Sequence, residues 1–255
     1  AASAVPVKKH NLPRPLEISE IAHVIKRHAE AARRAQQAGF DGVELQACHF
    51  YLLSAFLSGY LNRRTDAYGG DVQNRCRLTC EVIRAIKGLC GAGFPVIARI
   101  NAHENLPGGI TTEEGQEISA ILESAGCDCI HASAADALVN PDIAHLFDLQ
   151  VAGGPDDGAP QGALVPYAQG IKARVGIPVI TVGKIFDPRL AEQIIRAGKA
   201  DFVAMARALI VDPELPHKAA AGRYDEIEPC TECRTCHTSM QNKGDMRCAV
   251  NGQLY

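Results

Sequence analysis

The stretch AGFDGVEL (38–45) sets a pattern that returns three times, as GAGFPVIARI (91–100), AGCDCIHA (125–132) and AGKADFVAMA (197–206). In each copy a glycine is followed by a short apolar run, and IPVITVG (177–183) is a fifth such run. Short apolar runs of this kind are typical of parallel strands that are covered on both faces. Five strands are therefore predicted, and they lie within residues 40–46, 94–100, 127–133, 177–183 and 200–206.

Longer amphipathic stretches separate these runs. The first predicted helix spans 19–38, with Ser19 as its candidate N-cap and Gly39 just past its end. Further helices are predicted near 72–88, 112–125, 165–175, 187–198 and 213–221. Alternating strands and helices indicate an α/β fold, either a TIM barrel or an open doubly wound sheet. No G-x-G-x-x-G motif follows a strand, which favours the barrel, although five strands make only part of one.

The composition excludes several classes of protein. The chain has 255 residues, 47% of them hydrophobic, and a formal charge of −3, so it is not an intrinsically disordered chain. It has 26 Lys and Arg against 29 Asp and Glu, which argues against a nucleic-acid partner. No apolar run reaches the ~20 residues of a membrane span, and residues 1–18 lack the apolar core of a secretory signal.

Ten cysteines divide into two groups. Four crowd near the C-terminus as C-x2-C-x2-C-x11-C, and six are scattered. The scattered six are expected to be reduced packing thiols, which indicates a reducing compartment, the cytoplasm. The spacing of the terminal four favours a [4Fe–4S] cluster, with zinc or unligated thiols as alternatives. The four predicted ligands are Cys230, Cys233, Cys236 and Cys248, with His217 and His237 as possible substitutes.

Arg99 lies within the buried run 94–100, where a charge needs a partner. An internal ion pair is one interpretation. The other is a bound anion or a polarised ring, because active sites of barrels lie at the C-terminal ends of their strands.

Basic residues follow the last two predicted strands. Gly183 and Lys184 follow one strand, and Ala206 and Arg207 follow the other. The loops after the last two strands of a TIM barrel often bind phosphate. The alternative is that Gly183 only turns the chain and that Arg207 faces solvent.

Polar residues also follow the first strand. Gln46 and His49 could donate hydrogen bonds to a carbonyl oxygen, and Tyr51 could deliver a proton. The alternative is that His49 and Tyr51 are ordinary residues of the core or its rim.

The run FDGVELQACHFYLLSAFLSGYLNRRTDAYGGDVQNRCRL (40–78) resembles the old yellow enzyme family of FMN-dependent ene-reductases. PVITVGKIFDP (178–188), the segment 200–219 and the cysteine tail follow in the order of that family. The tail resembles the iron–sulfur branch, which includes 2,4-dienoyl-CoA reductase and the enoate reductases. The resemblance covers nearly the whole chain and implies strands 4–8 of a TIM barrel.

The resemblance implies roles for individual residues. Arg99 matches the arginine at the flavin N1/O2 edge, and Gly183, Lys184, Ala206 and Arg207 match the phosphate contacts. Tyr51 matches the tyrosine that protonates the substrate α-carbon while flavin N5 gives hydride to the β-carbon. Gln46 and His49 match the two carbonyl donors, with Gln46 in place of the usual histidine, and His145 is a further candidate after the third strand. Asp66, Tyr68 and Arg75 belong to the run 40–78 that carries the resemblance, which we call the signature run, and they are expected to be structural.

Three regions are therefore expected: an N-terminal extension (1–18), a partial barrel with the FMN and substrate site (19–223), and a [4Fe–4S]-binding segment (224–255). The expected substrate is an enoate or an enoyl- or dienoyl-CoA, and no nucleic acid or membrane partner is expected. Barrel strands 1–3 and the domains for FAD and NAD(P)H would lie outside this chain, so it is expected to be an internal fragment and inactive alone. The alternatives are another phosphate-binding barrel enzyme, such as an aldolase or isomerase, and a non-enzymatic iron–sulfur or zinc module.

Overall fold

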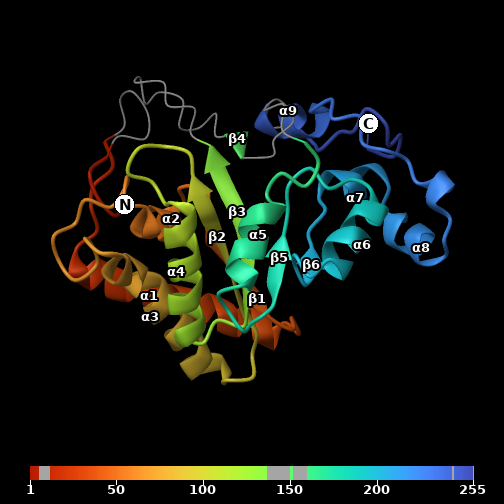
Figure 1. The fold of residues 1–255 in the computed structure, drawn as a ribbon. Coiled ribbons are helices and arrows are strands. Elements are labelled where there is room, and N and C mark those ends of the chain that lie inside the picture. The colour runs from red at the N-terminus through yellow and green to blue at the C-terminus, as the bar shows by residue number, and fades with distance from the viewer. Residues whose placement is uncertain (6–11, 137–149, 152–159, 243, 255) are drawn as a thin grey trace.

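A computed structural model describes residues 1–5, 12–136, 150–151, 160–242 and 244–254. Five parallel strands form one sheet in the order β1-β2-β3-β5-β6, and the short β4 pairs antiparallel with β3 (Figure 1). The strands are β1 (Val43–Ala47), β2 (Val96–Glu104), β3 (Cys129–Asp136), β4 (Gln150–Val151), β5 (Val179–Thr181) and β6 (Phe202–Val203). All five predicted strands are confirmed; β4 was not predicted.

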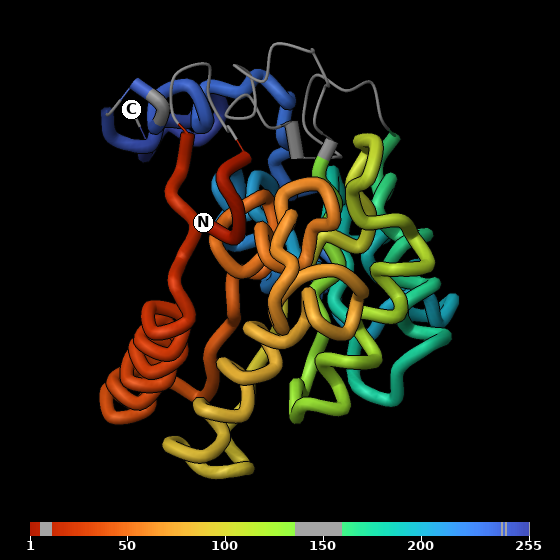
Figure 2. Tube along the Cα trace, turned by 90° about the vertical axis from the view of Figure 1, so that its left-hand side faces the viewer, coloured from red at the N-terminus to blue at the C-terminus, as the bar shows by residue number. Residues whose placement is uncertain are grey.

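Helices connect the parallel strands, as expected for β/α units. They are α1 (Ile18–Gln37), α2 (Leu52–Leu57), α3 (Val72–Cys90), α4 (Thr112–Ser124), α5 (Val165–Lys172), α6 (Pro188–Arg196), α7 (Arg207–Val211) and α8 (Leu215–Ala220), followed by a 3₁₀ turn η2 (Tyr224–Glu226) and α9 (Thr235–Gln241). Figures 1 and 2 show the C-terminal segment at the end of the sheet where the β2 and β3 arrows point.

The two faces of the sheet differ in burial. One lateral row, in register across the strands, is mostly fully buried: Ala47, Ile100, Ala132, Thr181 and Val203. The next row on the opposite face is more exposed and more polar: Gln46, Arg99, His131, Ile180 and Phe202. Because side chains alternate between the faces of a strand, the two rows face opposite ways. We call the second side of the sheet the open face.

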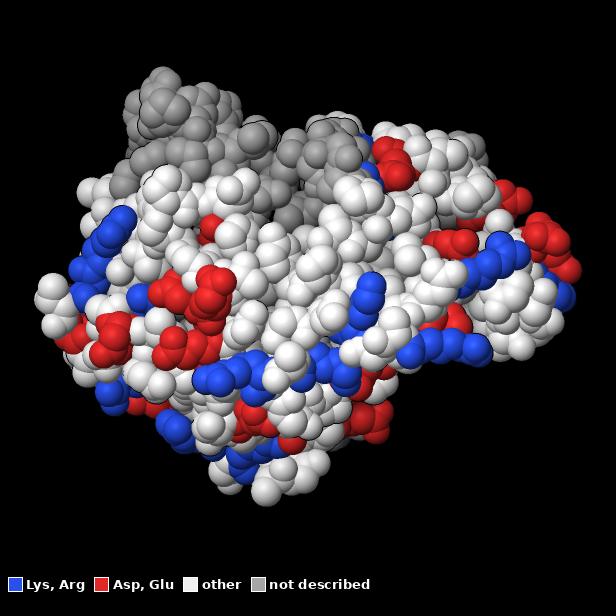
Figure 3. All heavy atoms as spheres, viewed as in Figure 1, with Lys and Arg blue, Asp and Glu red and all other residues white. Residues whose placement is uncertain are grey.

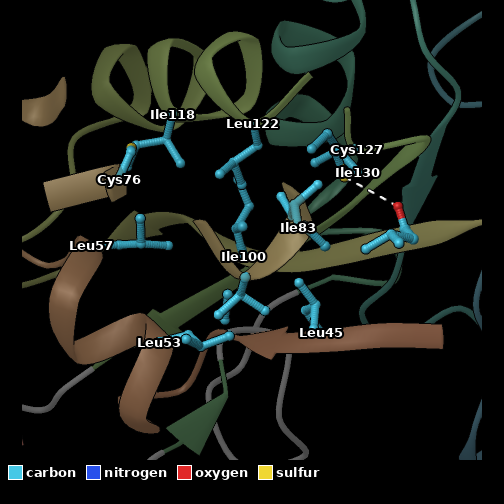
Figure 4. Close-up of a cluster of buried hydrophobic side chains, with 14 of the residues drawn as sticks. Leu45, Leu53, Leu57, Cys76, Ile83, Ile100, Ile118, Leu122, Cys127 and Ile130 are labelled. Atoms are coloured by element: carbon cyan, nitrogen blue, oxygen red, sulfur yellow. Dashed lines mark hydrogen bonds between the residues drawn. The ribbon is translucent and has the colours of Figure 1, made fainter. Parts of the chain in front are cut away.

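The hydrophobic core lies between the covered face and the helices. Figure 4 shows side chains of α3 and α4 above those of β1 and β2. Ile83 and Leu122 meet Ile100 there, and all three are fully buried. The six scattered cysteines are buried and free, in agreement with packing thiols: Cys48, Cys76, Cys80, Cys90, Cys127 and Cys129.

The predicted cap of the first helix is wrong. The helix begins at Ile18, so Ser19 lies inside it, and Glu17 is the N-cap residue. The Glu20 carboxylate accepts a hydrogen bond from the Glu17 N–H at 2.8 Å, which satisfies a backbone donor that the helix leaves free. Gly39 follows the helix with φ +89°, as expected for its C-terminal turn.

The N-terminal segment is tied to the signature run. Arg64 donates to the carbonyl oxygens of Ala2 and Leu16, and the Asp66 carboxylate accepts three further bonds from the same guanidinium. Arg75 is buried and donates to Leu57, to Gly70 and to the Glu114 carboxylate. These contacts are structural, as predicted for this run.

Charges of both signs are interspersed on the face of the molecule shown in Figure 3. Among the described residues, no helix combines the length and the apolar character that a bilayer crossing requires.

Candidate active site

Two of the predicted site residues, Gln46 and Arg99, lie within neighbouring parallel strands. Gln46 of β1 pairs in register with Arg99 of β2, and both lie on the open face. Gln46 is exposed, while Arg99 is half-buried between β1 and β3. The sheet therefore places an amide and a guanidinium side by side on a surface that the described helices leave uncovered.

Arg99 keeps a buried donor unused. Its Nε has no hydrogen-bond partner among the described residues, and no ion pair to Arg99 is formed within them. A buried guanidinium donor without a partner is costly, so such groups usually meet a ligand or a further part of the protein. The internal ion pair considered from the sequence is not found in the described part of the chain.

The chain turns sharply where β1 ends. His49 and Phe50 are consecutive non-glycine residues in the left-handed region, with φ +54° and +57°. The His49 N–H donates to Asn101 Oδ1 at 3.0 Å, and the Phe50 N–H donates to Ser54 Oγ at 3.2 Å. These contacts hold a conformation that side chains rarely adopt.

The His49 ring is held as well. His49 Nε2 lies 2.9 Å from the hydroxyl oxygen of Ser133, which is fully buried in β3. Burial, with the nearby charge of Arg99, lowers the pKa of His49 to about 4. The imidazole is therefore neutral at pH 7, and one of its ring nitrogens carries the only N–H.

Tyr51 follows this turn as the N-cap residue of α2. Its side chain is 60% exposed, so a substrate could reach the phenol. Gln46, His49 and Tyr51 thus come from one strand end and one turn. His145, the remaining candidate on this side, lies outside the described residues.

Two basic side chains converge after β5 and β6. Lys184 Nζ lies 3.2 Å from Glu232 Oε2, and Arg207 lies 4.0 Å from the same oxygen. Gly183 has φ +113°, and a Cβ there would meet the Leu164 side chain at 2.9 Å, so this turn requires glycine. A carboxylate oxygen thus sits where the two cations could hold a phosphate oxygen.

The four terminal cysteines line one small pocket together with Arg207. The backbone N–H groups of Val250 and Asn251 donate to Cys248 Sγ at 3.4 and 3.3 Å. Hydrogen bonds from Thr235 and Thr231 lower the pKa of Cys233 to about 7. Within the described residues, no three His, Cys, Asp or Glu side chains are arranged around a single metal ion. His217 of α8 bonds the carboxylate of Glu214, the N-cap residue of that helix.

Sequence reasoning missed several groups on and beside the open face. His131 Nδ1 lies 2.7 Å from the Glu44 carboxylate, and its buried Nε2 has no partner among the described residues. Asn101, Ser133 and Glu232 were also missed. A histidine inside the apolar run 127–133 was a signal that could have revealed His131. The contact of Glu232 with Lys184 and Arg207 joins distant segments, and no local sequence signal reveals such a contact.

Comparison with known proteins agrees with this geometry. The model of the NADH:flavin oxidoreductase / NADH oxidase family matches residues 2–226. A NADH oxidase of Thermoanaerobacter brockii is 44% identical over 221 residues, which are 87% of this chain and 32% of that protein. A cinnamate reductase of Clostridium sporogenes is 37% identical, over 93% of this chain and 37% of that protein.

Among solved structures, a 2-naphthoyl-CoA reductase in complex with 2-naphthoyl-CoA matches with a TM-score of 0.88 and 30% identity. The match covers all of this chain and 37% of that one. The chain belongs to the NADH:flavin oxidoreductase / NADH oxidase family. The resemblance to old yellow enzymes is confirmed, as is an α/β fold made of part of a TIM barrel. The chain spans about a third of the length of the curated relatives it matches.

The matched family is one of flavin oxidoreductases, so FMN is the cofactor that family membership indicates. The alternatives of an aldolase- or isomerase-type barrel and of a non-enzymatic module receive no support from these matches.

Proposed function

We propose that this chain carries the FMN and substrate half-site of a reductase that acts on activated C=C bonds of enoates or of enoyl- or dienoyl-CoA thioesters. The observation that carries the proposal is Arg99, whose buried Nε has no partner in the described part of the chain beside the exposed amide of Gln46. The names of the relatives, a cinnamate reductase and a 2-naphthoyl-CoA reductase, support an unsaturated acyl substrate.

The residues fit an FMN molecule at two points. Arg99 would bind the N1/O2 edge of its ring, where a cation stabilises negative charge. Gly183, Lys184, Ala206 and Arg207 would hold its phosphate, because two cations converge beside the glycine turn that ends β5. When bound, FMN supplies the hydride that the β-carbon of the substrate receives.

Three side chains would act on the substrate. Gln46 and neutral His49 would donate hydrogen bonds to its carbonyl oxygen, where negative charge develops as the β-carbon accepts hydride. Tyr51 would then give its phenolic proton to the α-carbon, which leaves the saturated product. The exposure of Tyr51 and Gln46 on one side of the sheet supports these roles.

We assign the terminal segment to a [4Fe–4S] cluster held by Cys230, Cys233, Cys236 and Cys248. Four cysteines around one pocket and backbone N–H donors to Cys248 Sγ support this assignment, because such donors stabilise ligating thiolates. The spacing C-x2-C-x2-C-x11-C favours the cluster over zinc, because zinc sites more often use two separated C-x2-C pairs. The cluster would pass electrons from domains for FAD and NAD(P)H outside this chain.

The wider setting of the chain is also a proposal. The ten free cysteines fit the reducing cytoplasm. The open face would be completed by barrel strands 1–3, and the regions 1–18, 19–223 and 224–255 would keep the roles assigned from the sequence. In isolation we expect the chain to be inactive.

The test is the cofactor content of protein purified without oxygen. We expect about four iron and four sulfide per chain. We also expect FMN to bind and enoates to be reduced once strands 1–3 are supplied. Zinc in place of iron, or no flavin in the completed barrel, would overturn the proposal.

A further inference from the structure

Two left-handed residues in a row form a costly turn, and here they carry a proposed substrate donor. Only glycine adopts this region readily, so a non-glycine residue there is strained. His49 and Phe50 both adopt it. Something in the surrounding structure must therefore hold the turn.

Asn101 and Ser54 each bond one residue of the turn. Asn101 Oδ1 accepts from the His49 N–H at 3.0 Å, and Ser54 Oγ accepts from the Phe50 N–H at 3.2 Å. Asn101 Nδ2 also lies 3.3 Å from Ser54 Oγ, so the two acceptors are joined to each other. Asn101 and Ser54 are fully buried, which excludes water as a replacement donor or acceptor.

Glu104 holds Asn101 of this pair in place. Asn101 Nδ2 donates to Glu104 Oε1 at 3.0 Å, which fixes the amide with its oxygen toward His49. Ser58 Oγ and the Ile110 N–H donate to the other carboxyl oxygen at 2.7 and 3.1 Å. The orientation of the Asn101 amide therefore follows from its partners.

The same arrangement aims the His49 ring. Asn101 and Ser133 are neighbours in register on β2 and β3. His49 thus reaches from the end of β1 across β2, with its backbone N–H on Asn101 and its Nε2 2.9 Å from Ser133 Oγ.

We infer that Asn101, with Ser54 and Glu104, forms a buried polar clamp that holds the left-handed turn and so positions His49 as a hydrogen-bond donor. Asn101 is a positioning residue, since it contacts the backbone of His49 and not the substrate side of its ring. The functional meaning of the clamp rests on the proposed role of His49, but its existence does not.

The first test compares Asn101→Ala with Asn62→Ala in the full 255-residue chain. Asn62 is a matched control, because it is also a buried asparagine but bonds the carbonyl oxygens of Phe56 and Tyr68. The readout is the pKa of His49 from its ring resonances by NMR. In Asn101→Ala we expect it to rise by about one unit or more toward the value of a solvated histidine, as the turn loosens.

In Asn62→Ala we expect the pKa of His49 to stay near its original value of about 4. A folded Asn101→Ala protein with an unchanged pKa of His49, or an equal change in both variants, would overturn the inference. If Asn101→Ala does not fold, Ser54→Ala replaces it with the same expected direction, because it removes the other acceptor.

The second test is a double-mutant cycle with Phe50→Gly, read as urea midpoints. Glycine adopts φ +57° without strain, so the clamp has less to hold in that background. We expect Asn101→Ala to lower the midpoint clearly less in Phe50→Gly than in the original chain. Strictly additive losses would show that Asn101 only fills the core. Neither readout involves flavin or substrate, so failure of the proposed function would not affect these results.

Discussion

Arg75, which is buried, and Arg99, which is half-buried, differ in their partners. Arg75 bonds two carbonyl oxygens and the Glu114 carboxylate, whereas the buried Nε of Arg99 has no partner among the described residues. The first arrangement stabilises a fold, and the second leaves a desolvated donor for something still to bind.

Replacement by methionine should separate these two roles. We expect Arg75→Met to lower the free energy of unfolding by about 3–5 kcal/mol, because it leaves buried acceptors and a carboxylate unpaired. Arg99→Met should leave it unchanged or raise it by about 1 kcal/mol, while FMN binding in the completed barrel is lost. Chemical denaturation of both variants measures the difference. Equal losses of stability would show that Arg99 has a structural partner.

His49 makes stability depend on pH. Its folded pKa of about 4 lies below the usual 6.5, so protonation favours the unfolded chain. The stabilisation is complete above pH 6.5 and is lost as the pH falls toward 4, by up to about 3 kcal/mol. His49→Gln should flatten this part of a denaturation series, and His217→Gln, at an exposed site, should not. An unchanged slope in His49→Gln would show that another group titrates.

Among the elements, the loop that carries Cys230 and Cys233 reaches the predicted phosphate site. Glu232 lies between these cysteines with φ +56°, and its carboxylate faces Lys184 and Arg207. An anion bound by these cations has to share them with Glu232 or displace it.

Glu232→Gln should therefore strengthen the binding of inorganic phosphate by about fivefold to tenfold, which is about 1 kcal/mol. Glu228→Gln is the matched control, because it makes the same charge change on an exposed side chain of the same segment. Calorimetric titration of both variants measures the effect. The same gain in both would indicate net charge alone, and no gain would place phosphate elsewhere.

The elements also show which parts of the fold the sequence encodes locally. The five parallel strands were predictable, because glycine-terminated helices and apolar runs are local patterns. The ends of the strands were less predictable: β2 continues through 101–104, where Asn101 and Glu104 are buried, because both are satisfied by distant partners. The two-residue β4 leaves no pattern, since its pairing with β3 is its only signature.

The residues of the candidate site also divide into those that a local sequence pattern reveals and those that it does not. Arg99 was recognisable as a charge inside an apolar run, and the cysteines by their spacing. His49 contacts Asn101, which is 52 residues away in the sequence, and Ser133, which is 84 residues away. No local sequence pattern predicts such contacts. The same holds for the convergence of Lys184 and Glu232.

At the scale of the whole molecule, the open face is the surface that most favours self-association. Phe202 is 55% exposed in the open-face row, and both β1 and β6 are edge strands in the described sheet. Exposed apolar groups beside unpaired edges favour association.

We expect the isolated chain to self-associate at micromolar concentration and Phe202→Lys to reduce this association. Leu89→Lys, at the exposed end of α3, makes the same change away from the open face and should have no such effect. Sedimentation velocity over a range of concentrations measures both. A monomer at every concentration, or equal effects of the two changes, would show that the open face is not the contact.

The alternation between the two faces of the sheet also has an evolutionary consequence. Leu45, Ala98 and Ile130 pack in the core, while Gln46, Arg99 and His131, each one residue further along, face the other way. Substitutions at the second set leave the core packing intact. Descendants of one ancestral sheet could therefore acquire new substrates at these positions while every intermediate still folded, and neighbouring codons of one strand would evolve at different rates.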